Sequence, residues 1–246
     1  MRIALLSDIH ANVGALRACL KHAGEHGAER FAFLGDLVGY GADCDAVMDI
    51  VTRYALAGAI TLKGNHDEAI AKSSSYFNES AKAALDLARA SLGAEHKRFL
   101  AALPLLQRGD QQCYVHASAA MPERWSYIDS PTAAKRCVDA AQATYTFCGH
   151  VHDQLLYFEN QRGRMCEFRP VPGTAIPVSS RRRWVAIVGS VGQPRDRNPA
   201  AAYALFDRGA ELLTFYRVSY DALAAADSIR KSGLPESLAH RVERGI

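Results

Sequence analysis

Hydrophobic runs of strand length alternate with amphipathic stretches of helical length through the first two thirds of the chain. This order is typical of βαβ units, whose parallel strands are buried on both faces and joined by helices. The runs predict strands near Ile3–Leu6, Phe31–Leu34, Ile60–Leu62, Cys113–Val115 and Tyr145–Phe147. The stretches between them predict helices at Val13–His26, Cys44–Tyr54, Asn78–Leu103 and Thr132–Ala143, with a loop at Ser73–Phe77.

The pattern changes after about residue 153, where short alternating runs are separated by turn-forming residues. Residues 160–163 and 207–209 are rich in Asn, Asp and Gly and predict hairpin turns. We expect antiparallel strands near Leu155–Phe158, Met165–Phe168, Trp184–Val188, Tyr203–Phe206 and Leu212–Val218, followed by helices near Tyr220–Lys231 and Glu236–Val242. The sequence therefore predicts an α/β fold in which parallel strands come first and antiparallel strands later.

The composition favours a globular enzyme over a dedicated nucleic-acid binder. With 246 residues and 49% hydrophobic residues, the chain has the size of a single domain spanning 1–246. The net charge of +3 is a mild basic excess, which permits an anionic substrate without demanding one. No segment has the length of a membrane span or of a signal-peptide core. Six cysteines without a C-x-x-C pair indicate neither a zinc ribbon nor a disulfide scaffold, so we expect a cytoplasmic protein.

Polar residues of one chemical kind follow each predicted parallel strand. In open α/β sheets ligands bind outside the carboxyl ends of the strands, so these residues should meet at one edge. A lone Asp or His in a loop is more often a helix cap or a solvated side chain. Five strand ends that all supply Asp, His or Asn indicate instead the donor set of a divalent metal. The residues are Asp8, His10, Asp36, Asn65, His66, His116, His150 and His152.

The other histidines and the glycines complete this prediction. Glycine lets the backbone turn sharply out of a strand and approach a crowded site closely. We expect it to do so at Gly35, Gly64 and Gly149, each directly before a candidate ligand, although all three could be ordinary strand ends. Four further histidines are predicted on helix surfaces away from the site: His22, His26, His96 and His240.

The ordered series of motifs resembles the calcineurin-like metallophosphoesterase superfamily. The motifs are Asp8-Ile9-His10, Gly35-Asp36 with Gly41, Gly64-Asn65-His66-Asp67, His116 and Gly149-His150-Val151-His152. Within the superfamily the chain is most similar to small bacterial metallophosphatases related to diadenosine tetraphosphate hydrolases, a group that shares a loop like Gly189–Asp196. The resemblance implies a four-layer αββα fold: a parallel-rich mixed sheet packs on an antiparallel sheet, with helices outside.

The resemblance also implies a binuclear metal centre. One ion would be bound by Asp8, His10, Asp36 and His152, and the second by Asp36, Asn65, His116 and His150. Mn, Fe, Zn and Ni ions all remain possible occupants, because mixed Asp, His and Asn sites accept several metals. A hydroxide shared by the two ions would attack phosphorus directly. His66 would act beside the leaving group as general acid or charge stabiliser, oriented by Asp67 or Glu68, and Asn65 would also contact substrate.

One departure from the superfamily bears on the substrate. Protein phosphatases of this type carry Asp-Arg after the second motif, whereas this chain has Gly39-Tyr40. Arg195, in the loop Gly189–Asp196, is a candidate replacement for the phosphate-binding arginine, with a solvated loop arginine as the alternative. We therefore predict small phosphate esters or nucleotide phosphoanhydrides as substrates. Specificity would come from the loops Leu37–Asp45, Ser73–Asn78 and Ala117–Ser130.

Two further features and three rival functions stay open. Asn12 is either a helix N-cap or a phosphate contact. The run Arg181–Arg183 is either a solvated start of a strand or a basic surface that attracts acidic substrates or single-stranded nucleic acid. A phosphoprotein phosphatase or a nuclease of the same superfamily would use the same metals, but we do not expect a nucleic-acid or membrane partner. A non-catalytic scaffold with this fold tends to lose a ligand or the histidine, and all of these are present here. The sequence does not indicate an oligomeric state.

Overall fold

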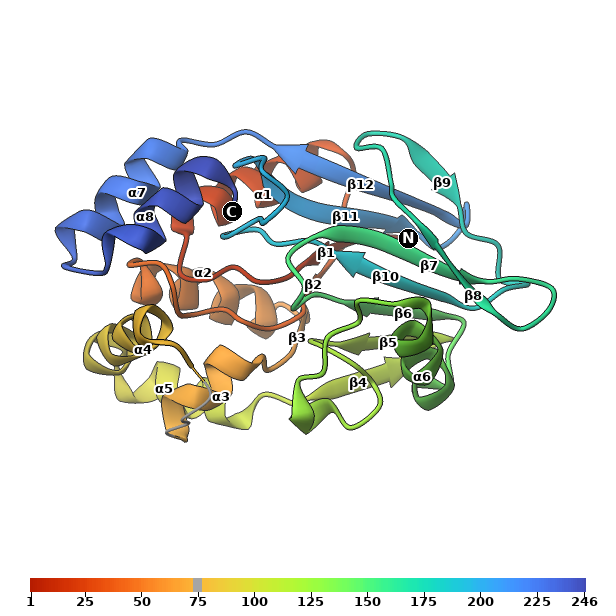
Figure 1. Cartoon of the computed structure of the whole chain (residues 1–246), viewed down its shortest axis with the longest axis horizontal. Helices are drawn as coiled ribbons and strands as arrows, with labels where there is room; N and C mark the ends of the chain where they lie inside the picture. Colours follow the sequence, from red (N-terminus) through yellow and green to blue (C-terminus); the bar gives the residue numbers. More distant parts are fainter. Residues whose placement is uncertain (73–76) are drawn as a thin grey trace.

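Two six-stranded sheets form the centre of the molecule in the computed structural model, which describes residues 1–72 and 77–246 (Figure 1). The strand order of the first sheet is β3-β2-β1-β11-β12-β9, and β1, β2 and β3 run parallel. Its strands are β1 Arg2–Leu6, β2 Arg30–Phe33, β3 Ile60–Thr61, β9 Ala175–Pro177, β11 Ala201–Asp207 and β12 Leu212–Val218.

The second sheet has the order β4-β5-β6-β10-β7-β8, in which β5, β6 and β10 are parallel and the remaining pairs antiparallel. Its strands are β4 Leu106–Gly109, β5 Gln112–Val115, β6 Tyr145–Cys148, β7 Gln154–Glu159, β8 Met165–Phe168 and β10 Trp184–Val188. The helices of the described residues are α1 Val13–Glu25, α2 Cys44–Leu56, α3 Asn65–Ala71, α4 Glu79–Ser91, α5 Ala94–Ala102, α6 Pro131–Ala141, α7 Ala222–Lys231, α8 Glu236–Arg244 and the 3₁₀ turn Pro122–Arg124.

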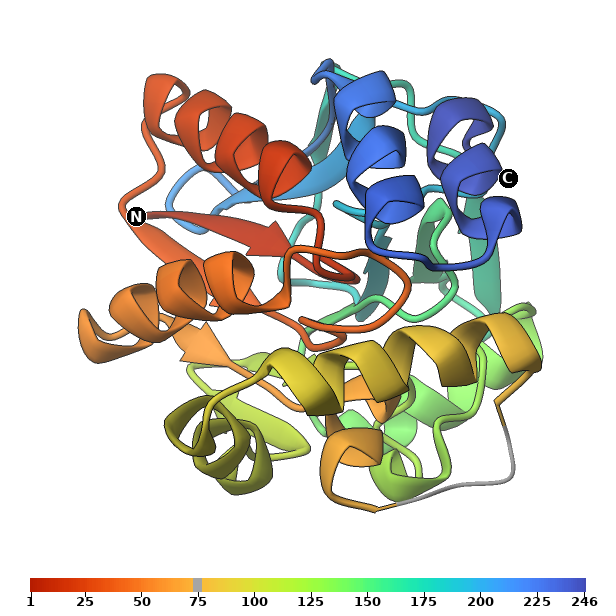
Figure 2. The same ribbon diagram turned by 90° about the vertical axis from the view of Figure 1, so that its left-hand side faces the viewer.

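Alternation along β1 shows how the layers pack. Ile3 and Leu5 face the second sheet, in a core shared with Phe147 of β6. Ala4 and Leu6 point the other way, into a core covered by α1 and α2. A third core lies between the outer face of the second sheet and α6. Helices therefore cover both outer faces, and the αββα sandwich implied by the resemblance is confirmed (Figure 2).

The distribution of parallel and antiparallel strands differs from the expected one. Each sheet combines both kinds, because β11 from the C-terminal half adds to the free edge of β1 and pairs antiparallel with it. Strand β10 lies in the half predicted to be antiparallel, yet it runs parallel to β6, with Trp184 opposite Tyr145. Pairing between distant segments decides this arrangement, and local alternation does not reveal it.

Four further features differ from the sequence prediction. The long helix expected over Asn78–Leu103 is two helices, α4 and α5, because the chain is extended at Leu92 and Gly93. Residues 65–71 form α3, and α3, β4 and β9 were all absent from the prediction. Asn78 caps α4 by accepting from Ala81 N–H, while residues 73–76 of the predicted loop lie outside the described residues. No described helix has the length and apolar character required to cross a membrane.

Candidate metal centre

The predicted ligands come from the carboxyl ends of strands in both sheets. Asp8 and His10 follow β1, Asp36 follows β2, and Asn65 begins α3 just after β3. His116 follows β5, and His150 and His152 follow β6. The expectation of one edge of one sheet was therefore wrong. The strand ends of two packed sheets converge, and the sandwich brings the two halves of the site together.

Backbone geometry marks the same residues. Five of them have a positive φ angle, in the left-handed region that non-glycine residues rarely occupy. Such conformations cost roughly 1–3 kcal/mol each and persist where the surrounding structure enforces them, commonly at functional sites. The residues and their φ angles are Asp8 at 52°, His10 at 49°, Asp36 at 52°, His150 at 66° and His152 at 69°.

The glycines before these residues make the close approach possible. A Cβ at Gly149 would overlap with the side chains of Ser7 and Asp8, and a Cβ at Gly64 would overlap with the Asp36 carboxylate. The neighbouring backbone amides use this space: His150 N–H donates to Asp8 Oδ2 at 2.9 Å, and His66 N–H donates to Asp36 Oδ1 at 2.8 Å. Glycine is required here for lack of space, as the sequence predicted.

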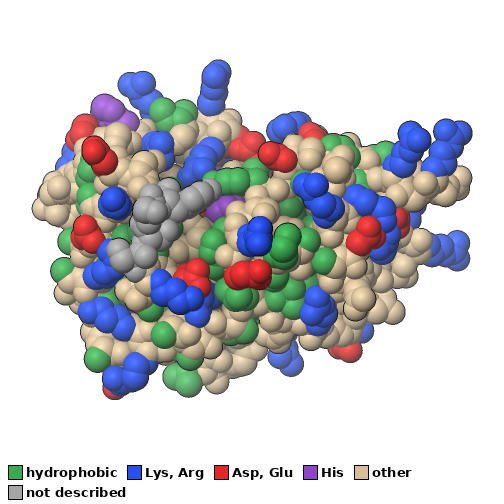
Figure 3. All heavy atoms as spheres, turned by 60° about the horizontal axis from the view of Figure 1, so that its bottom comes forward, with side chains coloured by type: hydrophobic (Ala, Val, Ile, Leu, Met, Phe, Trp, Pro, Cys, Tyr) green, Lys and Arg blue, Asp and Glu red, His purple; other side chains and the backbone are tan. Residues whose placement is uncertain are grey.

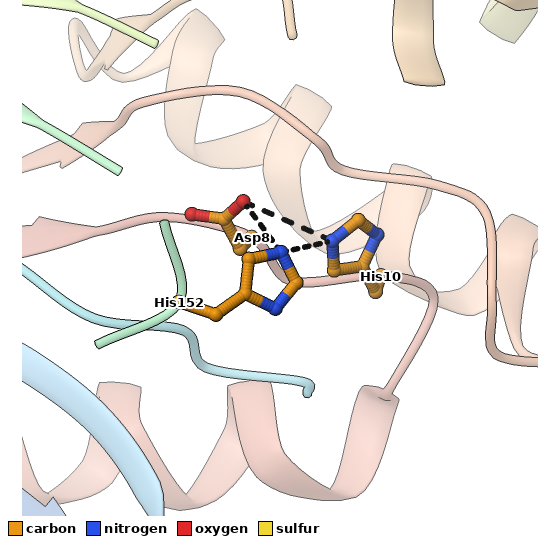
Figure 4. A group of neighbouring side chains, drawn as sticks. All are labelled: Asp8, His10 and His152. Atoms are coloured by element: carbon orange, nitrogen blue, oxygen red, sulfur yellow. Dashed lines mark hydrogen bonds and ion pairs between the residues drawn. The ribbon is translucent and has the colours of Figure 1, made fainter. Parts of the chain in front are cut away.

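Asp8, His10 and His152 form one group of converging donors (Figure 4). His152 Nε2 lies 3.1 Å from Asp8 Oδ1, and His10 Nε2 lies 3.2 Å from His152 Nε2. All three side chains are buried, and Asp8 Oδ1 accepts no hydrogen bond. A buried carboxylate oxygen facing two imidazole nitrogens is a donor arrangement that fits a divalent cation.

Asp36, Asn65, His116 and His150 form a second group beside the first. His116 Nε2 lies 3.2 Å from Asn65 Oδ1, 3.2 Å from His150 Nδ1 and 3.4 Å from Asp36 Oδ2. The same Asp36 oxygen is 3.7 Å from His10 Nε2 in the first group. Asp36 therefore lies between the two groups, the position that a bridging ligand requires.

Hydrogen bonds on the far side of three imidazoles fix the orientation of their rings. In each ring Nδ1 lies at hydrogen-bond distance from a backbone carbonyl oxygen, which only accepts, so Nδ1 carries the proton. The pairs are His10 with Val38 at 3.2 Å, His152 with Gln193 at 2.5 Å and His116 with Leu34 at 2.9 Å. Each Nε2 then faces the site, as in metal-binding histidines.

The electrostatics of the cluster favour positive charge. Burial alone would raise the pKa of Asp8 and Asp36, but the neighbouring imidazoles hold the pKa of both carboxyls below its usual range. Although burial opposes it, the charge of Asp36 raises the pKa of His116 to about 9. Burial lowers the pKa of His150 to about 3. The two carboxylates thus stabilise a cation at this place, which is the condition a metal site must meet.

His66 lies at the edge of the cluster, and its predicted partners do not reach it. Asp67 accepts three backbone hydrogen bonds instead, and Glu68 accepts from Lys72 and Trp125. The expectation that Asp67 or Glu68 orients His66 was wrong, and His66 Nδ1 is buried without a hydrogen-bond partner. Burial lowers the pKa of His66 to about 4, an effect that Asp36 only partly offsets.

A cavity of about 350 Å³ opens over both groups. Figure 3 shows histidine side chains in a hollow of this face, with lysine and arginine side chains around it. Arg195 lines the cavity beside His66, so the structure brings this predicted residue to the site. Each of the three loops expected to set specificity contributes a described residue to the wall, namely Tyr40, Phe77 and Tyr127.

Sequence reasoning missed Arg241, which lines the same cavity from α8. No motif surrounds it, and its helix lies far along the chain from the recognised series.

Asn12 proves to be the N-cap of α1, accepting from Ala15 N–H at 3.0 Å. In the arginine run, Arg183 is engaged by Glu159 and Asp139. The four histidines predicted away from the site do not line the cavity, although His22, His26 and His96 are half-buried and only His240 is exposed.

Comparisons with known proteins agree with this geometry. The family model described as the calcineurin-like phosphoesterase superfamily domain matches residues 1–210. The crystal structure of a metallophosphoesterase from Sphaerobacter thermophilus is 36% identical, with a TM-score of 0.90 over 100% of this chain and 99% of that one. An uncharacterized protein from Methanocaldococcus jannaschii is 30% identical over 99% of this chain and 98% of its own. A hypothetical protein from Pyrococcus horikoshii shares the fold, with 21% identity and a TM-score of 0.81 over 100% of this chain and 98% of its own.

The fold, the donor set and these matches together define a metal-dependent phosphoester hydrolase. The chain belongs to the calcineurin-like phosphoesterase superfamily, whose model covers more than half of its residues. The resemblance found in the sequence motifs is thereby confirmed.

Proposed function

We propose that this hydrolase uses two divalent ions and acts on small phosphate esters or nucleotide phosphoanhydrides. One observation carries the proposal: two buried donor groups share Asp36 at the floor of a cavity that also holds an arginine. Two ions held side by side suit phosphoryl transfer, in which both the attacking and the leaving oxygen carry negative charge.

The first ion would be held by Asp8, His10, Asp36 and His152, and the second by Asp36, Asn65, His116 and His150. Mn, Fe, Zn and Ni all accept such donors, and availability decides among them. When bound, two such ions supply an acidified water and offset the charge on the phosphoryl oxygens.

The chain's own residues would bind and orient the substrate. The Asn65 amide and the Arg195 guanidinium both line the cavity and offer N–H donors to phosphoryl oxygens. His66 also lines the cavity, where a leaving oxygen can receive a hydrogen bond from its imidazole. A phosphate dianion would raise the pKa of His66 through its negative charge. Burial of the donor atoms excludes water from all directions except the mouth of the cavity.

The test is an assay of metal-reconstituted protein against phosphomonoesters, phosphodiesters, dinucleoside polyphosphates and phosphoserine peptides. We expect the small substrates to have the higher kcat/KM, because the cavity of about 350 Å³ has the size of a small ligand. A wide preference for peptides would instead indicate a phosphoprotein phosphatase. Absence of turnover with full metal occupancy would favour the non-catalytic scaffold.

His66 needs a separate test, because its ring nitrogen also lies within 4.8 Å of donors from His10 and Asp36. His66→Ala should lower turnover by about 10²–10⁴-fold, as loss of a general acid does, while metal content stays unchanged. The control is His152→Ala, which should lose metal. If His66→Ala also loses metal, His66 is a ligand rather than a catalytic group.

The remaining expectations on partners and location stay proposals. We propose a small phosphate-containing substrate as the only partner that the site requires, with no role for nucleic acid or a membrane. The cytoplasmic location inferred from the cysteines and the single domain over 1–246 also stay predictions.

A further inference from the structure

Two arginines from different parts of the chain line the cavity above the metal centre. Arg195 comes from the loop between β10 and β11, and Arg241 comes from α8. Figure 2 shows α8 in dark blue and α4 in yellow on opposite sides of the loops that follow β1 and β2. The family model ends at residue 210, so Arg241 lies beyond the part of the chain that defines the superfamily.

Neither guanidinium has a carboxylate in direct contact among the described residues, although Arg195 acts on the Asp153 carboxyl over a longer distance. Among the described residues, no carboxylate lies within ion-pair distance of Arg195 or Arg241. The acids nearest along α8, Glu236 and Glu243, each contact Arg230 at 2.8 Å instead. Arg195 donates to the neutral Gln193 amide at 3.2 Å and also interacts with the Tyr40 side chain, and among the described residues its buried Nε has no hydrogen-bond partner. Two cations beside a cavity, neither of them in an ion pair, favour an anionic ligand.

The protein also holds both arginines in place. Arg195 lies over the ring of Tyr40, with 5.9 Å from Cζ to the ring centroid. Burial raises the pKa of Tyr40, and the charges of both Arg195 and Arg241 act against this rise. Helix α8 is fixed through Leu238 and its buried neighbours, which pack against α4 and α7. Arg241 therefore projects from a packed helix and not from a loose chain end.

We propose that Arg195 and Arg241 form a second phosphate subsite, so that the preferred substrate carries two adjacent phosphoryl groups, as nucleoside and dinucleoside polyphosphates do. This inference rests on the proposed function, because the first phosphoryl group must lie beside Asn65 and His66. A phosphoanhydride supplies two such groups joined by one bridging oxygen.

The reaction in such a substrate balances without a further reactant. Water adds to the phosphorus beside Asn65 and His66, and the bond from this phosphorus to the bridging oxygen breaks. The second phosphoryl group leaves with the bridging oxygen and remains held by Arg195 and Arg241. The protons of the water pass to the products or to solvent. The subsite thus stabilises the negative charge that the leaving group gains.

The experiment compares ADP with AMP, which differ by one phosphoryl group, as ligands of the manganese-loaded protein. Their inhibition constants are measured against hydrolysis of bis(p-nitrophenyl) phosphate with manganese in excess, and their affinities by calorimetry. We expect ADP to bind roughly 10–100-fold more tightly than AMP, the range of one or two charge-assisted hydrogen bonds. Arg241→Gln should reduce this ratio at least tenfold, and Arg241→Lys should restore part of it.

The matched control is Arg244→Gln, an exposed arginine on the same helix that does not line the cavity, and it should leave the ratio unchanged. Equal binding of ADP and AMP by the unmodified protein would overturn the proposal, and so would an equal loss of both ligands in Arg241→Gln. Absence of hydrolysis of any phosphate compound would contradict the proposed function instead, and calorimetry would still decide whether the subsite exists.

Discussion

Asp67 fixes the loop that carries Asp36, the proposed bridging ligand. Its replacement by asparagine tests how strongly a residue that is not itself a metal ligand controls metal binding and activity. Its buried carboxylate accepts from Leu37 N–H at 2.9 Å and Val38 N–H at 3.3 Å through one oxygen. The other oxygen accepts from Gly64 N–H at 2.8 Å. These bonds tie the start of α3 to the residues directly after Asp36.

Asparagine has the same shape but only one acceptor oxygen. If that oxygen serves Leu37 and Val38, the amide NH₂ faces the N–H of Gly64, and one buried donor is left unsatisfied. This costs about 1–3 kcal/mol. Loss of a residue that orients metal ligands typically lowers metal affinity or activity by about 10–100-fold. We expect Asp67→Asn to show both effects.

The measurement is urea unfolding with metal bound, together with metal titration and kcat/KM. Metal must be present in these measurements. Burial and the charge of Asp36 raise the pKa of Asp67 to about 7, so in the absence of cations Asp67→Asn would also relieve repulsion between the two carboxylates. Glu68→Gln is the control, since Glu68 bonds only to the side chains of Lys72 and Trp125. The reasoning is refuted if Asp67→Asn behaves like Glu68→Gln in all three measurements.

Three further changes test other parts of the structure. Asp36→Ala should reduce bound metal from about two equivalents to one or fewer, because a bridging ligand serves both ions; mass spectrometry of the reconstituted protein would contradict this if the stoichiometry were unchanged. Gly192→Ala places a Cβ against the carbonyl of Ile9 and should cost about 1–3 kcal/mol of unfolding free energy and lower activity, checked by thermal unfolding and assay. The hydrogen bond from Arg2 lowers the pKa of Asp207 below its unfolded value. The contribution of the Asp207 carboxylate to the free energy of unfolding is therefore present above about pH 4 and lost as the pH falls through the folded pKa. Asp207→Asn should therefore lower the free energy of unfolding by about 1 kcal/mol at pH 7 and leave it unchanged near pH 2. If urea unfolding gives the same difference between variant and unmodified protein at both pH values, the charge of the carboxylate is not its cause.

The metal-ligand candidates could be found in the sequence because their chemistry and their spacing are both local. Asp8 and His10 are two residues apart at the end of one strand, and so are His150 and His152. Glycine before Asn65 and before His150 likewise reflects a local lack of space, which the structure confirms. A strand end, its glycine and its polar residue belong to one short segment, so a single sequence carries the whole signal.

Only the tertiary structure decided how those segments meet. The ligands come from two sheets, because β11 and β10 from the distant half of the chain pair with β1 and β6. The support of the site is also non-local: Asp67 bonds to the loop after β2 and leaves His66 without the partner expected from the sequence. Arg241 reaches the cavity only because α8 packs against α4 and α7. Contacts between segments distant in sequence depend on the packing of whole elements, and this packing leaves no mark in the local pattern of residues.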